Sequence, residues 1–232
     1  MFKFITLVVA VAIIGFIIYA MVGSGPKDSV IDSMNGQDSS NVDGESNVDS
    51  NEELSNEINV NNSMSENKVV TFNTSAGSFK IELFVDKVPN TAGNFLKLAS
   101  EGFYDGTRFH RVIDGFMIQG GDPLSRDEDE RAMWGTGDPG YKFDDEFGEG
   151  LSNVSGTISM ANSGPNTNGS QFFINVADNT FLDYDKEPLT SKHSVFGKVV
   201  EGMDIVVAIS KVATGSRDMP VEDVIVESIS VQ

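Results

Sequence analysis

Two stretches of the chain concentrate residue types that could do chemistry without a nucleophile. The first, residues 109–122, reads Phe-His-Arg-Val-Ile-Asp-Gly-Phe-Met-Ile-Gln-Gly-Gly-Asp and sets Arg111 among aromatic and thioether side chains. The second, residues 160–174, is a loop rich in Gly and Asn with β-forming residues on both sides. If each stretch contains a strand, alternation places Gln171 and Phe173 on one sheet face. A guanidinium, which stays charged, next to such a face marks a candidate recess, although a solvated Arg over ordinary core Phe gives the same pattern.

Most familiar catalytic sets are absent from the 232 residues. The lack of Cys excludes disulfides, thiolate metal sites and a Cys nucleophile, and two His, His110 and His193, are too few for a His-rich metal centre. The metalloprotease, serine-hydrolase, dinucleotide-binding and phosphate-loop patterns do not occur either. With 35 acidic and 16 basic residues, a net charge of −19 argues against nucleic acid as a partner. Hydrolysis by a conventional nucleophile is therefore not expected.

The chain divides into three regions, and the first is an apolar run at the N-terminus. Residues 4–22 carry no charge and follow Lys3; as a helix they would span roughly 28 Å, close to the ~30 Å hydrocarbon core of a bilayer. We expect residues 1–23 to anchor the protein in a membrane, with the rest on the extracytoplasmic side because positive charge stays in the cytoplasm. A cleaved signal peptide, which would make the protein secreted, and a buried core helix are the alternatives.

The second region, residues 24–67, is rich in Asn and Ser and holds ten acidic residues but only one basic residue, Lys27. Its few apolar residues are too scattered to offset the entropy cost of folding, so we predict a disordered acidic linker. A calcium-binding tract is the alternative, but the fixed spacing and Gly of a calcium loop are missing.

The third region, residues 68–232, consists of short β-forming runs separated by Gly, Asn and Asp. Strands are predicted at 68–72, 78–84, 108–113, 116–119, 157–160, 171–176, 195–199 and 221–231, and helices at 90–101 and 202–209. The pattern is mainly β and favours a closed antiparallel barrel with helices over its ends, with a sandwich as the alternative.

The two chemistry-bearing stretches resemble the signature segments of the cyclophilins, a family of peptidyl-prolyl cis-trans isomerases. The resemblance runs from about Val69 to Val231 and includes Val-Phe-Gly-Lys-Val at 195–199, before the second helix. It implies that residues 68–232 form a cyclophilin-like isomerase domain, a closed eight-stranded antiparallel β-barrel capped by two α-helices. This agrees with the fold class favoured by the strand pattern.

The resemblance also implies a role for individual residues. Arg111 would be the main catalytic residue, and His110 would be buried and structural. The pocket for the proline ring would be lined by Phe116, Met117 and Phe173, with Leu182 at its edge. The peptide backbone would be bound by Gln119, Ala161, Asn162 and Gln171, with His193 at the rim.

Three departures from the family pattern stand out. Phe181 occupies a position where many eukaryotic members carry a Trp that contacts cyclosporin, so we expect weakened affinity for cyclosporin-type inhibitors. The loop at 183–192 is longer than usual before His193. Residues 123–140 form a charged excursion, which is either a solvated loop or an element that disfavours acidic substrates. Trp134 within it would pack it down.

The implied reaction is rotation about X-Pro bonds of proline-containing polypeptides. The barrier is near 20 kcal/mol, and in the twisted transition state the proline nitrogen regains a lone pair that a guanidinium can stabilise. Neither a covalent intermediate, a metal nor an organic cofactor is required. We expect a membrane-tethered isomerase acting on exported polypeptides, as a monomer, since the apolar run lacks a Gly-x-x-x-Gly pair. The alternatives are a proline-peptide binding module or chaperone with little turnover, and an acidic surface protein using the barrel as scaffold.

Overall fold

The computed structural model describes residues 67–187 and 192–232. The predicted anchor at 1–23 and all but the last residue of the predicted linker at 24–67 lie outside these ranges. Within them, no helix is both long enough and apolar enough to cross a membrane.

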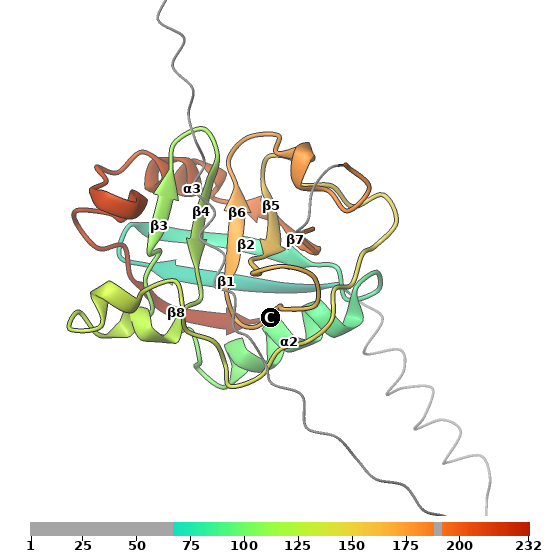
Figure 1. The fold of residues 1–232 in the computed structure, drawn as a ribbon, viewed down its shortest axis with the longest axis horizontal. Coiled ribbons are helices and arrows are strands. Elements are labelled where there is room, and N and C mark those ends of the chain that lie inside the picture. The colour runs from blue at the N-terminus through green and yellow to red at the C-terminus, as the bar shows by residue number, and fades with distance from the viewer. Residues whose placement is uncertain (1–66, 188–191) are drawn as a thin grey trace, which may run out of the picture. The chain divides into compact units, whose positions relative to one another are not determined.

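The described part of the chain contains eight strands and two α-helices, as the sequence predicted, together with four short 3-10 helices (Figure 1). The strands are β1 Lys68–Thr74, β2 Gly77–Leu83, β3 Arg111–Ile113, β4 Met117–Gly120, β5 Thr157–Met160, β6 Phe172–Asn175, β7 Val195–Glu201 and β8 Val226–Val231. The helices are α2 Pro89–Ser100 and α3 Met203–Ser210.

All eight strands belong to one antiparallel sheet, with the order β3-β4-β6-β5-β7-β2-β1-β8. The sheet curls into a half-barrel, and the prediction of a fully closed barrel is therefore wrong. Within the described ranges, no ladder joins the edge strands β3 and β8. The gap is spanned by one bridge between Arg108 and Ile225 and by backbone hydrogen bonds beside it, such as Phe109 N to Val224 O at 3.0 Å.

This bridge explains two differences between the predicted and observed strands. The run predicted as a strand from residue 108 contributes only Arg111–Ile113 to the β3–β4 ladder, because residues 106–109 pair with residues 224–226 instead. The closing strand, predicted from 221, begins at Val226, because Val221 N donates to the carbonyl of Ala213 in a separate turn. In both cases a long-range partner competes with the local β pattern.

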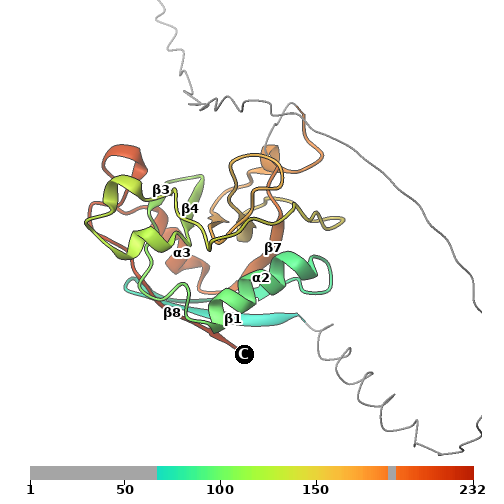
Figure 2. The ribbon, with the colours of Figure 1, turned by 60° about the horizontal axis from the view of Figure 1, so that its bottom comes forward.

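The core is aromatic. The ring of Phe72 stacks on that of Phe79 with centroids 4.8 Å apart, and α2 contributes Phe95, whose ring lies 5.7 Å from Phe172 and 5.3 Å from Phe196. Such ring pairs contribute about 0.5–1.5 kcal/mol each beyond their buried area. Helix α2 contacts β7 and β8, whereas α3 contacts β2, β3 and β4, so the two helices cover different parts of the sheet (Figure 2).

Glycine is required where β4 leaves the sheet. Gly121 has a φ of +83°, and a Cβ there would lie 2.5 Å from the carbonyl oxygen of Ser170 and 2.9 Å from the ring of Phe172. Only a residue without a side chain allows this approach. The Gly-Gly pair therefore brings the end of β4 against the start of β6, next to the residues considered below.

Candidate functional site

Three strands place the central side chains of the site next to one another. In the antiparallel register Arg111 of β3 pairs with Gln119 of β4, and Gln119 pairs with Phe173 of β6. Directly paired residues project from the same face of a sheet with their Cβ atoms about 5 Å apart. A guanidinium, an amide and an aromatic ring thus form a row across the sheet, as the two sequence stretches suggested.

This row borders a cavity of about 590 Å³. Its walls include most of the site residues expected from the sequence: Arg111, Phe116, Met117, Gln119, Ala161, Asn162, Phe173, Leu182 and His193. The cavity is therefore polar along the Arg111 side and apolar at its base.

The apolar base is rigidly packed. Met117 is 2% exposed and Phe173 is 4% exposed, so only one surface of each is open to the cavity. The ring of His193 stands edge-on to that of Phe173, with centroids 5.2 Å apart and an interplanar angle of 84°. A small saturated ring could bury apolar surface here against side chains that do not have to be reorganised.

Arg111 lies at the mouth of the cavity, with 43% of its side chain exposed. Its Nε donates to Oδ2 of Asp218 at 3.4 Å. Within the described residues, neither of its terminal nitrogens has a hydrogen-bond partner. Two donors of a fixed planar group are thus available to a ligand in the cavity.

The amide groups lie between two cavities. Gln119 donates to Oε1 of Gln171 at 3.1 Å, and Gln171 donates to the carbonyl of Gly137 at 2.9 Å. Gln171 does not border the first cavity; it borders a neighbouring one of about 260 Å³, which Gln119, Ala161 and Asn162 also line. The residues expected to bind peptide backbone therefore form the partition over which an extended chain could lie.

His193 is held in one tautomer. Its Nδ1 lies 2.9 Å from the carbonyl oxygen of Met160, so this nitrogen must carry the proton and donate. Burial lowers the pKa of His193 below its ordinary value, against smaller opposing effects of the Met160 carbonyl and Asp145. At neutral pH the ring is uncharged, with Nε2 as its acceptor. Part of the long loop preceding it, residues 188–191, lies outside the described ranges.

Phe181 is the expected site residue that does not border either cavity. Its side chain is 55% exposed, and its ring stacks on that of Phe116 with centroids 6.0 Å apart. It therefore backs a cavity wall from outside, and its contact with a ligand stays a prediction.

The sequence reasoning missed part of the cavity wall: Trp134, Gly135, Arg217, Asp218 and Met219 also line it. Arg217 and Asp218 follow α3 and come more than 100 residues after Arg111, and no local pattern links them. Trp134 was expected only to pack the excursion down, and it does so at 3% exposure. The excursion is thus part of the cavity wall as well as a surface loop.

His110 is buried, as expected, at 3% exposure, yet it also borders the cavity. Neither ring nitrogen has a hydrogen-bond partner among the described residues. Burial lowers its pKa to about 4, against the opposing charge of Asp122. The ring is therefore neutral at physiological pH and adds no charge next to Arg111.

In residues 67–187 and 192–232, no three His, Cys, Asp or Glu side chains are grouped so that they could hold a metal ion. What the described site offers is a cationic donor, amide groups and an apolar cup. Such a set can bind a peptide segment and stabilise a change in its charge distribution, without a covalent step.

Comparisons with known proteins agree with this chemistry. The family model described as cyclophilin type peptidyl-prolyl cis-trans isomerase/CLD matches residues 69–231. Peptidyl-prolyl cis-trans isomerase CYP18-1 of Arabidopsis thaliana is 44% identical over 164 residues, which cover 70% of this chain and 94% of that protein. Peptidyl-prolyl cis-trans isomerase-like 3 of Homo sapiens is 42% identical over 165 residues, with the same two coverages.

A solved structure shares the fold. The crystal structure of a cyclophilin type peptidyl-prolyl cis-trans isomerase of Cryptosporidium parvum matches with a TM-score of 0.63 at 33% identity, covering 72% of this chain and 98% of that one. A second crystal structure of that isomerase, in the presence of the dipeptide Ala-Pro, matches with a TM-score of 0.61.

Proposed function

This chain belongs to the cyclophilin-type peptidyl-prolyl cis-trans isomerases, and from that premise we propose that Arg111 stabilises the twisted X-Pro amide in the cavity described above. The observation that carries the proposal is the register that aligns Arg111, Gln119 and Phe173 across three strands. It puts a charged donor beside an apolar cup, which are the two groups that the reaction needs.

The proline ring binds against Phe173, Met117 and Phe116, where its apolar surface leaves water. The preceding residue extends over the partition formed by Gln119, Ala161 and Asn162. The cup holds the proline ring, and the partition holds the residue before it. The X-Pro bond between these two groups can then rotate. The dipeptide Ala-Pro, in whose presence a structure of the Cryptosporidium parvum relative was determined, contains a bond of this kind.

Arg111 acts on the transition state. In the planar amide the proline nitrogen shares its lone pair with the carbonyl, and rotation localises that pair on nitrogen. A terminal nitrogen of Arg111 then donates to it, an interaction that the planar ground state cannot make. Because it is made only during rotation, it raises the rate rather than merely tightening binding. Lowering the barrier by about 6 kcal/mol gives roughly four decades in rate.

The test compares the full-length protein in detergent with its Arg111→Ala and Arg111→Lys variants, using NMR exchange between the cis and trans forms of an Ala-Pro peptide. We expect Arg111→Ala to lose about a hundredfold in exchange rate, the order seen when one transition-state donor is removed. Arg111→Lys should recover little, because an ammonium lacks the planar donor geometry. Lys211→Ala, which removes an exposed cation outside the cavity, is the matched control and should match the wild type.

Exchange no faster than in buffer, with the peptide still bound, would instead indicate a binding module without turnover. Equal rates for the wild type and Arg111→Ala would remove the assigned role of Arg111.

The setting of the domain is a second part of the proposal. The uncharged run at 4–22 after Lys3, followed by an acidic linker, supports an isomerase tethered to a membrane and acting on exported polypeptides on the extracytoplasmic side. Membrane fractionation of cells, followed by protease treatment of intact cells, tests it. Removal of the domain by external protease is expected; a protein found only in the soluble cytoplasmic fraction would contradict the tether.

A further inference from the structure

We propose that Asp218 is a positioning residue for Arg111, and that residues 123–134 of the charged excursion hold Asp218 in place. The proposal rests on the assigned role of Arg111 in the isomerase reaction. It gives the excursion a function that neither a solvated loop nor a filter against acidic substrates would supply.

The contact between the two side chains is selective for one nitrogen. Asp218 Oδ2 accepts from Nε of Arg111 at 3.4 Å, and Asp218 lines the same cavity. Engaging Nε restricts rotation of the guanidinium about its stem, while both terminal nitrogens stay available. The carboxylate therefore orients the donors toward the ligand without competing for them.

The backbone around Asp218 adopts a conformation that needs support. Arg217 has a φ of 61° and Asp218 a φ of 58°, in the left-handed region that residues other than Gly rarely adopt. Residues of this kind cost of order 1–3 kcal/mol each and persist only where surrounding contacts hold them. The support comes from Arg217, which donates to the backbone carbonyls of Arg131 at 2.7 Å and Ala132 at 3.0 Å.

Those two carbonyls belong to the excursion, which is itself locked. Trp134 makes cation–π contacts with two guanidinium groups, with Arg131 at 4.6 Å and Arg108 at 5.2 Å from its ring centroid. Its indole N–H donates to the carbonyl of Asp127 at 2.9 Å, which closes the turn on itself. The excursion is therefore fixed by packing inside the protein, although its acidic side chains from Asp127 to Glu130 are exposed.

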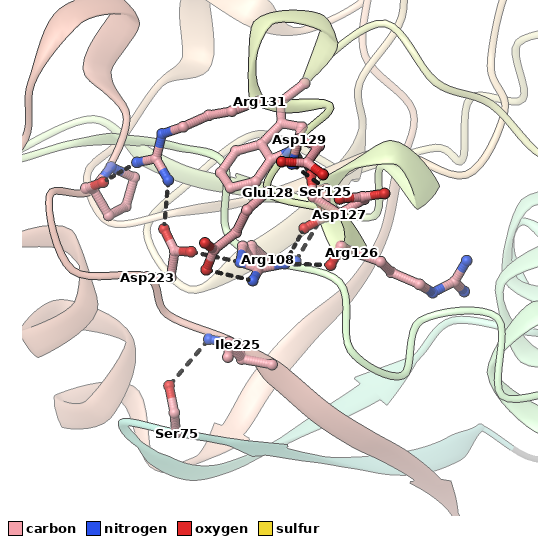
Figure 3. A network of polar contacts seen from close by, with 12 residues as sticks. Ser75, Arg108, Ser125, Arg126, Asp127, Glu128, Asp129, Arg131, Asp223 and Ile225 are labelled. Atoms are coloured by element: carbon pink, nitrogen blue, oxygen red, sulfur yellow. Dashed lines mark hydrogen bonds and ion pairs between the residues drawn. The ribbon is translucent and has the colours of Figure 1, made fainter.

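Asp223 ties the excursion to the segment that carries Asp218. One of its oxygens accepts from Nε of Arg108 at 2.6 Å and the other from Nη1 of Arg131 at 3.0 Å (Figure 3). Arg131 also donates to the carbonyl of Pro220 at 2.8 Å. Arg108 in turn donates to the carbonyl of Arg126 at 2.8 Å. Contacts therefore run from Arg108, which precedes β3, through the excursion to the 217–223 segment and back to Arg111.

The test removes the carboxylate without disturbing the backbone. In the full-length protein, Asp218→Gly keeps the positive φ at no steric cost, whereas Asp218→Asn keeps an acceptor oxygen and tolerates the same φ. We expect Asp218→Gly to lower the cis–trans exchange rate at saturating peptide about two- to fivefold, the range for a half-exposed ion pair, with Asp218→Asn in between. Peptide affinity, measured by NMR titration, should change less than the exchange rate.

Two further measurements separate positioning from a structural effect. In the Arg111→Ala background, Asp218→Gly should change the rate no further, because Asp218 acts only through Arg111. The Nε–H resonance of Arg111, assigned by its absence in Arg111→Lys, should be protected from solvent exchange in the wild type and lose that protection in Asp218→Gly. Asp114→Asn removes an exposed charge from the β3–β4 turn and is the matched control.

A wild-type rate retained in Asp218→Gly, or an equal loss in the Arg111→Ala background, would overturn the positioning role. Either result would leave the isomerase proposal intact, provided that the wild type still depends on Arg111. Loss of the wild-type dependence on Arg111 is the separate outcome that removes the proposed function itself.

Discussion

The Nδ1 of His193 donates a hydrogen bond to the carbonyl oxygen of Met160, at 2.9 Å. Met160 ends β5, so a residue that follows the long 183–192 loop is oriented by the sheet rather than by the loop. The same ring stands edge-on to Phe173, the base of the apolar cup. The rim of the cavity is thereby fixed although the loop leading to it is long.

Removing this ring should weaken substrate binding. In His193→Ala the cup loses a wall and an edge-to-face ring contact worth about 0.5–1.5 kcal/mol, so we expect the KM for a proline peptide to rise about three- to tenfold. The rate at saturation should change less, since no group that contacts the rotating bond is lost. Steady-state kinetics would show this split; a fall in kcat at unchanged KM would contradict it.

The unfolding free energy should decrease as the pH decreases, because of His110. Its folded-state pKa of about 4 lies below the ordinary 6.5, so as the pH falls the unfolded chain takes up a proton first. Stability is therefore complete above the ordinary pKa and is lost below it. From His110 alone we expect a loss of about 2 kcal/mol between about pH 7 and about pH 5.

His110→Phe keeps a buried ring but cannot titrate, so urea unfolding of this variant should be less sensitive to pH over the same range. The lowered pKa of His193 also reduces stability as the pH decreases. A weaker dependence of stability on pH should therefore remain in His110→Phe. A wild type and a variant with identical pH profiles would show that the burial of His110 does not control this response.

Asp223 should matter for folding far more than an ordinary surface carboxylate. It is paired with Arg108 and Arg131, and its side chain is only 16% exposed. In Asp223→Asn the Arg131 guanidinium loses this counter-charge and Arg108 keeps only the exposed Glu128, at 3.4 Å. We expect a loss of about 3 kcal/mol in unfolding free energy. Asp185→Asn, whose ion pair with Lys186 is exposed, should change stability by less than about 0.5 kcal/mol in the same denaturation experiment.

Cyclosporin binding should respond to one side chain outside the cavity. Phe181 stacks on Phe116 but is largely exposed, so a larger indole fits without repacking the core. A Trp would add an N–H donor, and one hydrogen bond of about 1 kcal/mol tightens binding roughly fivefold. We therefore expect Phe181→Trp to bind cyclosporin more tightly by calorimetry, with isomerase activity nearly unchanged. An unaltered affinity would show that Phe181 does not limit cyclosporin binding.

The local pattern of the sequence was sufficient for several elements, whereas the individual site residues were expected from the resemblance to the cyclophilins. The strand Thr157–Met160 was predicted with its observed bounds, and the helix after Val88 began within two residues of the predicted start. Arg111 and Phe173 were recognised because each lies in a stretch whose composition is unusual on its own. Alternation along a strand and periodicity along a helix depend on near neighbours, which the sequence shows directly.

The tertiary structure alone decided which distant segments complete these elements. Three features bring together residues that lie far apart in the chain. They are the bridge between Arg108 and Ile225, the contact of Asp218 with Arg111, and the presence of Trp134 in the cavity wall. Such contacts are selected by packing and charge pairing after the loops have closed, and the entropy of loop closure changes little with loop length. Sequence separation therefore carries almost no information about them, whereas the two stretches that contain Arg111 and Phe173 stand out in the order of their residues alone.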